Sequence, residues 1–593
     1  MSNEHNKDLA LIKRIFSLAK PYKFTFLFAA VLSITLAPVS ILRPYLVQLT
    51  VDQSIIGPER DQLMLMISLL VGALVIQGIL SYLFSYSTAW LGQSVIRDLR
   101  IRVFNHINRL RLTYFDTTPI GTSTTRTIND VETINSVFSQ GFITVIADIL
   151  TLFFVLSIML YTSWKVTLVC LVTVPFLILA TYWFKESIKR AFEVVRTQVS
   201  VMNAFLQEHI TGMRVVQIFN AEEKEFQKFS EINNKYKNAN IRSIFYYALF
   251  FPVVEILSAT SLGLMVWYGA RGVLNDEVTI GVLIAFPLYL GMLFRPIRML
   301  ADKFNTLQMG IVVARRIFSV LDRDDHIDDQ GQLHTDSFNG SIEFDQVYFS
   351  YDQDIYTEQI DEWILENISF NLEPGETLAI VGSTGSGKTT IINILNRFYS
   401  YQKGQVHIDG EPIESYTLET LRSRIAIVLQ DVFLFSGSVM DNITLRSPHI
   451  SREQVIESAT MIGAHSFIMD LPGGYDYQVM ERGATLSMGQ RQLISFVRAL
   501  VFNPDILILD EATSAIDPET ESIIQYAIEK LVDKRTSIII AHRLSTIQHA
   551  DKIMVLDKGH IIEWGSHKEL IQLEGGHYKE LVDSAMDLKR VSR

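Results

Sequence analysis

The sequence predicts an all-α membrane domain with six helices, followed by a domain in which strands and helices alternate. Two observations carry this prediction. Long apolar runs recur through the first half of the 593-residue chain, and its mean hydropathy of +0.22 and hydrophobic fraction of 48% are high for a soluble protein. The second half instead contains short apolar runs followed by glycine, aspartate or histidine, as in α/β sheets.

Six apolar runs are long enough to cross a bilayer as helices that rise about 1.5 Å per residue. As a helix, the second run would extend well beyond the roughly 30 Å of hydrocarbon. The third and fourth runs are separated by so few residues that we expect a tight hairpin at 162–165, and the sixth should continue as a helix to residue 321. The runs are 24–42, 62–96, 137–164, 166–184, 243–270 and 278–294.

The distribution of basic residues predicts the orientation of these helices. Segments 97–130 and 185–242 are rich in arginine and lysine, whereas loops 52–61 and 271–277 are short and lack a basic cluster. By the positive-inside rule, both long segments and both termini are cytoplasmic.

The N-terminus is too charged for a signal peptide, and the apolar residues at helical spacing in 9–16 predict an amphipathic helix on the inner membrane surface. An ordinary soluble helix would show the same pattern.

Composition disfavours several classes of function. The net charge is −12 and no long basic run occurs, so nucleic-acid binding is disfavoured. Because Cys170 is the single cysteine, no intramolecular disulfide can form, and its side chain is expected to be a buried hydrophobe.

Asp148 and Glu255 lie well inside predicted spans, where an acid either faces an aqueous substrate path or forms a structural hydrogen bond between helices. Both interpretations stay open for these two acids.

The polar, acidic segment 322–340 predicts a linker, which divides the chain into a membrane domain, 1–321, and a second domain, 341–593. In the second domain, segment 382–389 fits the P-loop pattern G-x-x-x-x-G-K-[ST] between an apolar strand, 377–381, and a predicted helix. Its glycines allow backbone N–H groups to surround phosphate oxygens, and the helix N-terminus favours negative charge. A glycine-rich structural turn is the alternative. The predicted ATP-binding residues are Gly382, Ser383, Thr384, Gly385, Ser386, Gly387, Lys388, Thr389 and Thr390.

Further polar residues follow apolar strands of this domain. Lys388 is expected to reach the β- and γ-phosphates, and Thr389 and Asp510 are expected to hold Mg²⁺. Strand 506–509 leads into Asp510 and then Glu511, which is placed to activate an attacking water as general base. Strand 537–541 ends at His542, which we expect to contact the γ-phosphate.

These motifs resemble the nucleotide-binding domain of ABC transporters, an α/β P-loop NTPase (ABC ATPase), in both order and spacing. The signature is similar at 486–490, the D-loop at 514–517 and the exporter-type loop at 481–483. Two positions depart from the family pattern, since Met488 replaces a usual glycine and Ile516 a common leucine. Because Ser487 and Gly489 are retained, we expect the signature to work. The resemblance implies further site residues: Tyr351 for adenine stacking, Gln430 for Mg²⁺ and catalysis, and Ser487, Met488, Gly489 and Gln490 for phosphate.

The first half also resembles ABC exporters, in 114–116, at Gly121 and Arg126, in 129–130 and in 208–226. With six spans and one nucleotide domain per chain, the resemblance implies a homodimer, with each ATP held between the P-loop of one copy and Ser487 of the other. It also implies catalysis by Glu511, His542, Gln430 and Lys388. The alternatives are one subunit of a heterodimeric exporter and, less expected, an ATP-gated channel or regulator.

The predicted cargo is a small amphipathic or lipid-like compound, moved across the cell's inner (plasma) membrane by a multi-pass protein in the lipid bilayer. The sequence contains no feature that selects among drugs, lipids and lipid-linked molecules. ATP and Mg²⁺ are the predicted cofactors.

Overall fold

The computed structural model describes residues 2–56, 62–138, 142–327, 329–351, 363–510, 518–541 and 544–583. The chain forms two compact units, each with its own core. The first contains residues 1–108 and 118–324, and the second contains residues 109–117 and 325–593. The sequence did not predict that 109–117, from the middle of the membrane half, packs with the C-terminal unit.

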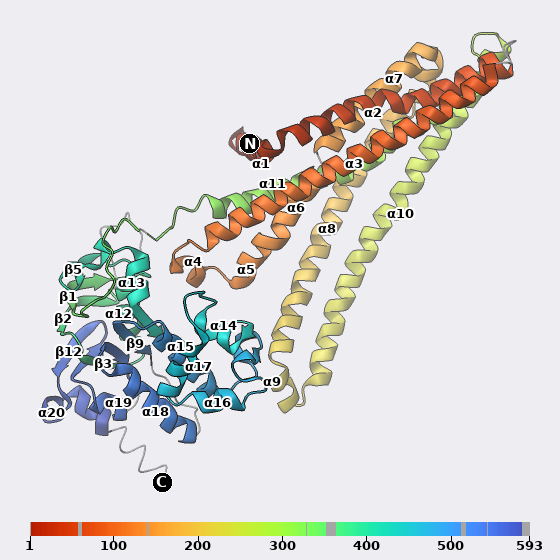
Figure 1. The fold of residues 1–593 in the computed structure, drawn as a ribbon. Helices are drawn as coiled ribbons and strands as arrows, with labels where there is room; N and C mark the ends of the chain where they lie inside the picture. Colours follow the sequence, from red (N-terminus) through yellow and green to blue (C-terminus); the bar gives the residue numbers. More distant parts are fainter. Residues whose placement is uncertain are drawn as a thin grey trace. The chain divides into compact units, whose positions relative to one another are not determined.

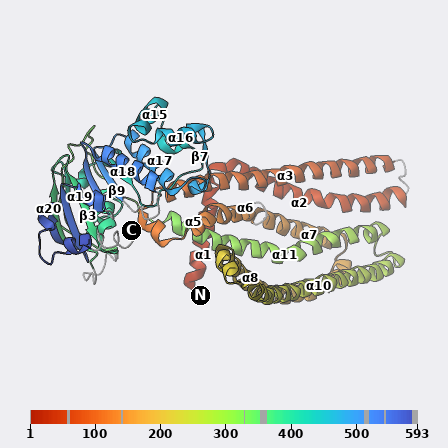
Figure 2. The same ribbon diagram turned by 90° about the horizontal axis from the view of Figure 1, so that it is seen from below.

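Long helices build the first unit (Figure 1), and the described residues of the predicted spans lie largely in them. The second predicted span is part of a helix of 45 residues, or about 67 Å, so it extends beyond a bilayer as expected. Figure 2 shows α2 beside α3 and α8 beside α10. The long helices are α2 Lys23–Leu49, α3 Leu63–Ile107, α7 Phe142–Leu171, α8 Val174–Thr211, α10 Glu222–Leu274 and α11 Ile280–Leu321.

Length and hydropathy mark several of these helices as membrane spans. Of the described helices, α11 qualifies only as a shorter apolar stretch, Ile280–Pro296. Four stretches in the described part of the chain meet both criteria: Lys20–Ile55, Leu63–Ile107, Ile143–Leu171 and Glu222–Leu274.

The predicted boundary between the third and fourth spans is only partly right. Ser163, within the predicted hairpin 162–165, has extended angles of φ −159° and ψ 98° that interrupt α7. The predicted fourth span, 166–184, is not one helix, because a turn at 172–173 separates the end of α7 from the start of α8. Pro175 explains this second break, since proline lacks an N–H group and favours the first turn of a helix.

Shorter helices complete the first unit: α1 Ser2–Leu18, α5 Ile120–Thr125, α6 Val131–Ser136 and α9 Met213–Ile218. The predicted amphipathic helix α1 packs within the unit. Its Ile15 is buried, and its Phe16 makes edge-to-face contacts with Phe26 and Phe138. Arg14 forms an ion pair with Asp322. The apolar side of α1 is therefore at least partly covered by protein.

The tip of the α8–α10 hairpin, which carries α9, contains a histidine with an acceptor at each ring nitrogen. Nδ1 of His209 lies 2.8 Å from the carbonyl oxygen of Phe205, and Nε2 lies 2.7 Å from Oε2 of Glu225. Both contacts are hydrogen bonds only when both nitrogens are protonated. The Phe205 carbonyl, Glu225 and the nearby Glu208 raise the pKa of His209 above its usual value, against the effect of burial. Lys228 also donates to Glu225, at 2.9 Å.

We expect this histidine to make the hairpin tip pH-dependent. Because its pKa is raised on folding, protonated His209 stabilises the tip below about pH 6.5, and this stabilisation is lost as the pH rises through the folded-state pKa. Hydrogen exchange of residues 213–219, corrected for intrinsic rates, should therefore be faster in His209→Gln than in the parent at low pH only. The exposed His449 provides the matched control, His449→Gln. A difference of equal size at all pH values would contradict the prediction.

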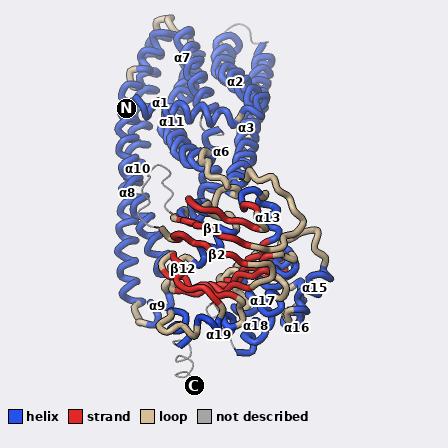
Figure 3. The backbone as a smooth tube through the Cα atoms, turned by 90° about the vertical axis from the view of Figure 1, so that its left-hand side faces the viewer, coloured by secondary structure: helices blue, strands red, loops and turns tan. Residues whose placement is uncertain are grey.

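The described part of the second unit contains two large sheets (Figure 3) and a small two-stranded one, formed by β7 Gly437–Ser438 and β8 Gln478–Val479. An antiparallel sheet has the order β2-β1-β4-β5, with β2 Leu365–Leu372, β1 Ile342–Phe349, β4 Lys403–Ile408 and β5 Glu411–Pro412. The larger sheet has the order β12-β11-β3-β10-β9-β6 and is parallel except for β12. Its strands are β12 His560–Gly565, β11 Lys552–Asp557, β3 Thr377–Gly382, β10 Thr536–Ile540, β9 Ile506–Asp510 and β6 Ile425–Val428.

The larger sheet is buried on both faces, which explains why its central strands are continuously apolar in sequence. Along β3, Leu378 and Ile380 enter the core shared with the antiparallel sheet and α12 (Lys388–Leu395). Ala379 and Val381 enter the core on the opposite face, which the remaining helices cover. These helices include α14 Val439–Thr444, α15 Arg452–Met461, α17 Met488–Val501 and α18 Pro518–Val532.

Candidate nucleotide-binding site

The predicted site residues follow neighbouring parallel strands at one edge of the larger sheet. Ile540 of β10 pairs with Ile380 of β3 on one side and with Asp510 of β9 on the other, and Val428 of β6 pairs with Leu509. The chain therefore leaves β3, β10, β9 and β6 at the same edge. This is the edge at which α/β sheets bind ligands.

The P-loop connects β3 to α12 as predicted. Gly385 and Gly387 have φ values of +83° and +106°, a left-handed conformation that other residues adopt only at a cost. Gly387 is the N-cap of α12, and its carbonyl oxygen accepts from the backbone N–H of Thr390 at 3.1 Å. The N–H groups that start a helix point out of its N-terminal end, where they suit an anion. A Cβ at Gly382 would lie 2.1 Å from the carbonyl oxygen of Leu556, so this position also requires glycine.

Lys388 is held within this loop. Its Nζ donates to the carbonyl oxygens of Gly382, at 2.9 Å, and Ser383, at 2.8 Å. Burial lowers the pKa of Lys388, while the charge of Asp510 opposes that shift. The charges of Lys388 and Asp510 therefore interact, although Lys388 begins α12 and Asp510 ends β9. This geometry directs one positive charge into the loop.

The P-loop residues offer donors suited to a triphosphate. The side chains of Ser383, Thr384 and Thr389 are exposed. Ser386 is buried, and its hydroxyl has no partner among the described residues, so an added oxygen ligand would satisfy it. The exposed hydroxyl of Thr389 and the half-buried carboxylate of Asp510 are oxygen donors of the type that Mg²⁺ prefers, so the residues present fit this metal.

The signature begins a second exposed helix N-terminus. Ser487 is the N-cap of α17, and its Oγ accepts from the backbone N–H of Gln490 at 3.2 Å. The side chain of Gln490 in turn accepts from the backbone N–H of Ser487 at 2.9 Å. In this cap the Ser487 hydroxyl acts as an acceptor, so the hydroxyl proton of Ser487 remains available to donate to an anion. Met488 is half-buried and Gly489 buried, so the methionine does not cover the exposed Ser487.

Tyr351 and Gln430 lie at other parts of the domain surface. Tyr351 is 41% exposed, and its hydroxyl lies 3.2 Å from Oγ1 of Thr390 in α12. Gln430 follows β6 and is exposed. The predictions for Glu511, His542 and the D-loop 514–517 fall outside the described residues.

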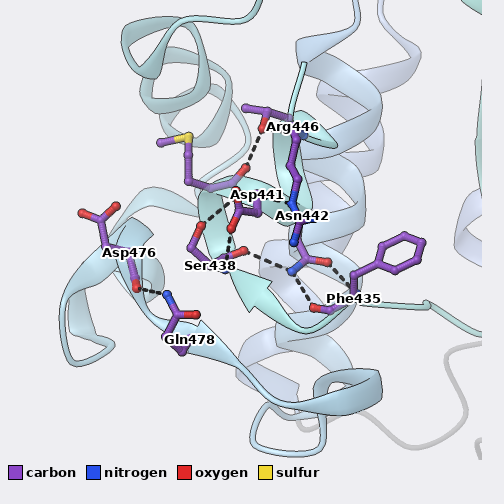
Figure 4. Close-up of polar contacts among 9 residues, drawn as sticks. Phe435, Ser438, Asp441, Asn442, Arg446, Asp476 and Gln478 are labelled. Atoms are coloured by element: carbon purple, nitrogen blue, oxygen red, sulfur yellow. Dashed lines mark hydrogen bonds and ion pairs between the residues drawn. The ribbon is translucent and has the colours of Figure 1, made fainter. Parts of the chain in front are cut away.

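Asn442 and Arg498 are two residues of this region that the sequence did not single out. Figure 4 shows how Asn442, from α14, holds the segment that follows Gln430. Its Oδ1 accepts from Phe435 N at 2.8 Å, and its Nδ2 donates to Phe435 O at 2.9 Å. Arg498 of α17 donates from Nε to the carbonyl oxygen of Asn442 at 2.8 Å. These contacts join the helix that starts at the signature to the segment after Gln430.

The acids predicted inside the spans have different environments. Asp148 of α7 forms an ion pair with Lys303 of α11, so the structural interpretation is the better one for this residue. Glu255 is exposed on α10.

Comparison with known proteins agrees with this geometry. The family model described as ABC transporter transmembrane region matches residues 26–297, and the one described as ABC transporter matches residues 365–514. The protein YknV of Bacillus subtilis, described as an uncharacterized ABC transporter ATP-binding protein, is 40% identical over 96% of this chain and 93% of its own length. The ATP-dependent lipid A-core flippase of Syntrophus aciditrophicus is 34% identical over 97% of this chain and 95% of its own.

A solved structure is similar to this chain over most of its length. A bacterial Atm1-family ABC exporter with ATP bound superposes with a TM-score of 0.76 at 28% identity, covering 94% of this chain and 97% of the other. The helical membrane domain, the P-loop ATPase domain and these relatives lead to one conclusion: the chain belongs to the ABC transporter family, as an exporter that joins both domains in one polypeptide.

Proposed function

We propose that two copies of this chain form the working exporter and that each ATP binds between the P-loop of one copy and Ser487 of the other. Membership of the family establishes ATP hydrolysis coupled to export. The observation that supports the two-copy site is the exposure of both phosphate-binding faces, at Thr389 and at Ser487, in a single chain. Each face offers a helix N-terminus to an anion, and the described residues leave Thr389 and Ser487 exposed.

Exposed apolar residues on α9 and at its C-cap also favour a second subunit. Val215 is 59% exposed, Ile218 67% and Phe219 76%. Large exposed apolar side chains that gather in one short segment are typical of a surface that binds a partner. In the proposed dimer, the second copy covers it.

The proposed mechanism uses ATP binding to bring the two ATPase domains together. Moving an equilibrium from about 1:99 to 99:1 requires about 5.5 kcal/mol of differential binding. Lys388 and the amides at the starts of α12 and α17 are the groups that would neutralise phosphate charge. Mg²⁺, which neutralises developing phosphate charge when bound, would be held by Thr389, Asp510 and Gln430. Glu511 would take a proton from the attacking water, and His542 would contact the γ-phosphate.

The number and identity of subunits test this proposal directly. We expect the purified complex to have the mass of two copies of the 67.5 kDa chain plus bound lipid. Native mass measurement with subunit identification provides the readout. Isolation of the chain only with a different subunit would instead establish a heterodimeric exporter.

We propose an amphipathic or lipid-like cargo. The names of relatives support this class, since one is a lipid A-core flippase and another a putative multidrug exporter, YgaD of Bacillus subtilis. Because Asp148 is paired with Lys303, this acid gives no support for a cationic cargo. Stimulation of ATP hydrolysis by candidate compounds in lipid vesicles tests this class of cargo.

Uptake of a compound into vesicles against its gradient separates an exporter from an ATP-gated channel, which allows only downhill flux.

We also propose that both termini and the ATPase domain are cytoplasmic, in the plasma membrane of the cell. The basic segments 97–130 and 185–242 support this orientation. Labelling of an engineered cysteine at the N-terminus in intact cells tests it, since a membrane-impermeant reagent should react only after permeabilisation.

Tyr351→Ala should weaken ATP binding about 5- to 150-fold, because stacking of a base on an aromatic ring contributes about 1–3 kcal/mol. Tyr351→Phe keeps the ring and should bind ATP nearly as well as the parent. Equilibrium binding of Mg-ATP provides the measurement. Unchanged affinity in the alanine variant would remove Tyr351 from the adenine site.

A further inference from the structure

Tyr351 belongs to a compact aromatic cluster in the second unit. Its ring meets that of Tyr399 edge to face, with the centroids 5.0 Å apart and the planes at 89°. Both rings also contact Phe349, at 4.8 Å from Tyr351 and 5.9 Å from Tyr399. Phe349 is fully buried and Tyr399 is 6% exposed, whereas Tyr351 keeps 41% of its surface open. Because Phe349 and Tyr399 are packed, a shift of the Tyr351 ring changes its contact with Tyr399.

The two tyrosine hydroxyl groups of the cluster form hydrogen bonds with two different helices. The hydroxyl of Tyr351 lies 3.2 Å from Oγ1 of Thr390, in the helix that follows the P-loop. The hydroxyl of Tyr399 donates to Oδ2 of Asp116, in the short helix α4 (Leu112–Thr117), although the two residues are 283 positions apart. Burial and the Asp116 carboxylate raise the pKa of Tyr399, so its phenol remains a donor at neutral pH.

The N-terminal end of α4 is attached to the unit independently of Tyr399. Arg111 N donates to the carbonyl oxygen of Asp325 at 2.9 Å, and Arg111 Nε donates to that of His326 at 2.8 Å. Leu112 packs against the core between the two sheets. Removal of the Tyr399 hydroxyl therefore takes away the contact at Asp116 and leaves those of Arg111, Leu112 and the buried Tyr114 in place.

We propose that Tyr399 is a positioning residue that couples adenine bound on Tyr351 to the placement of α4, through its ring contact with Tyr351 and its hydrogen bond to Asp116. The inference rests on the proposed stacking of adenine on Tyr351. Coupling between two sites is reciprocal. The hydrogen bond that holds α4 at Asp116 therefore also favours the position of the Tyr351 ring that stacks on adenine. The nucleotide thus acts on α4 through its base as well as through its phosphates.

Hydrogen exchange and binding in the full-length protein test this coupling. All variants carry Glu511→Gln to slow hydrolysis, and the probes are Mg-ATP and inorganic tripolyphosphate, which lacks the base. In the parent, ATP should slow exchange of residues 109–117 more than tripolyphosphate does. Tyr399→Phe and Asp116→Ala should abolish this difference and weaken ATP binding by about 5-fold or more, without changing tripolyphosphate binding. The double variant should be no weaker than either single variant, because both remove the same hydrogen bond.

Tyr578→Phe provides the matched control, since Tyr578 is also buried in this unit and bonds through its hydroxyl to His567, at 2.7 Å. It should behave as the parent in every measurement. An ATP response of 109–117 that is unchanged in Tyr399→Phe would overturn the coupling. Additive effects of Tyr399→Phe and Asp116→Ala would overturn it as well. Unchanged ATP binding in Tyr351→Ala would instead show that the proposed adenine site is wrong, so the two failures are distinguishable.

Discussion

Replacing Glu511 by glutamine is expected to lower the rate of ATP hydrolysis about 10²- to 10⁴-fold while ATP still binds. The amide has nearly the same shape as the carboxylate but cannot accept a proton from water at neutral pH. Glu511 directly follows β9, the strand that ends at Asp510, so the substitution leaves the neighbouring carboxylate unchanged. Phosphate release by the protein in lipid vesicles, together with equilibrium binding of Mg-ATP, measures both effects.

The control for this substitution is Glu529→Gln, which makes the same carboxylate-to-amide change at an exposed glutamate of α18. It should hydrolyse ATP at the parent rate. Hydrolysis by Glu511→Gln at the parent rate would exclude Glu511 as the general base. Loss of ATP binding in that variant would indicate a structural role instead.

Lys388→Met should lower kcat/KM for ATP by at least about 10²-fold, the usual cost of removing one group that stabilises transition-state charge. Lys388 is 8% exposed, and two loop carbonyls hold its Nζ, so no surface lysine can take its place. Lys388→Arg keeps the charge but has a larger planar head group, and we expect little recovery. Steady-state hydrolysis over a range of ATP concentrations gives the measurement.

An exposed lysine of α20 (His567–Leu570) supplies the control, Lys568→Met, which should be fully active. A Lys388→Met protein with parent kcat/KM would mean that the loop binds ATP without this charge. Equal loss in Lys388→Met and Lys568→Met would point to a general effect on folding.

The elements of the ATPase domain were predictable because their signals are local. The strand at 377–381, the glycines of 382–389 and the helix that follows them are adjacent in sequence, and the structure places β3 and α12 there. The strand before Asp510 was equally clear, since a strand buried on both faces is apolar throughout. Parallel pairing then brings Asp510 and the P-loop to one edge, as expected.

The membrane half was less completely predictable. Hydropathy located the long helices, but it did not detect the break before Pro175, since residues on both sides of it are apolar. It also gave no partner for Asp148, because Lys303 lies 155 positions away and contacts it only when α7 packs against α11.

The sequence by itself determined the long apolar helices, the ATPase fold, the glycine-rich loop after β3 and the family. Each of these depends on residue types at fixed short spacings, which the local geometry of helices, strands and glycine turns dictates. Only the tertiary structure decided that α4 belongs with the C-terminal unit, that Tyr399 meets both Tyr351 and Asp116, and that Asn442 holds Phe435. These contacts depend on how separately formed elements pack together, and no pattern within one element records its partner in another.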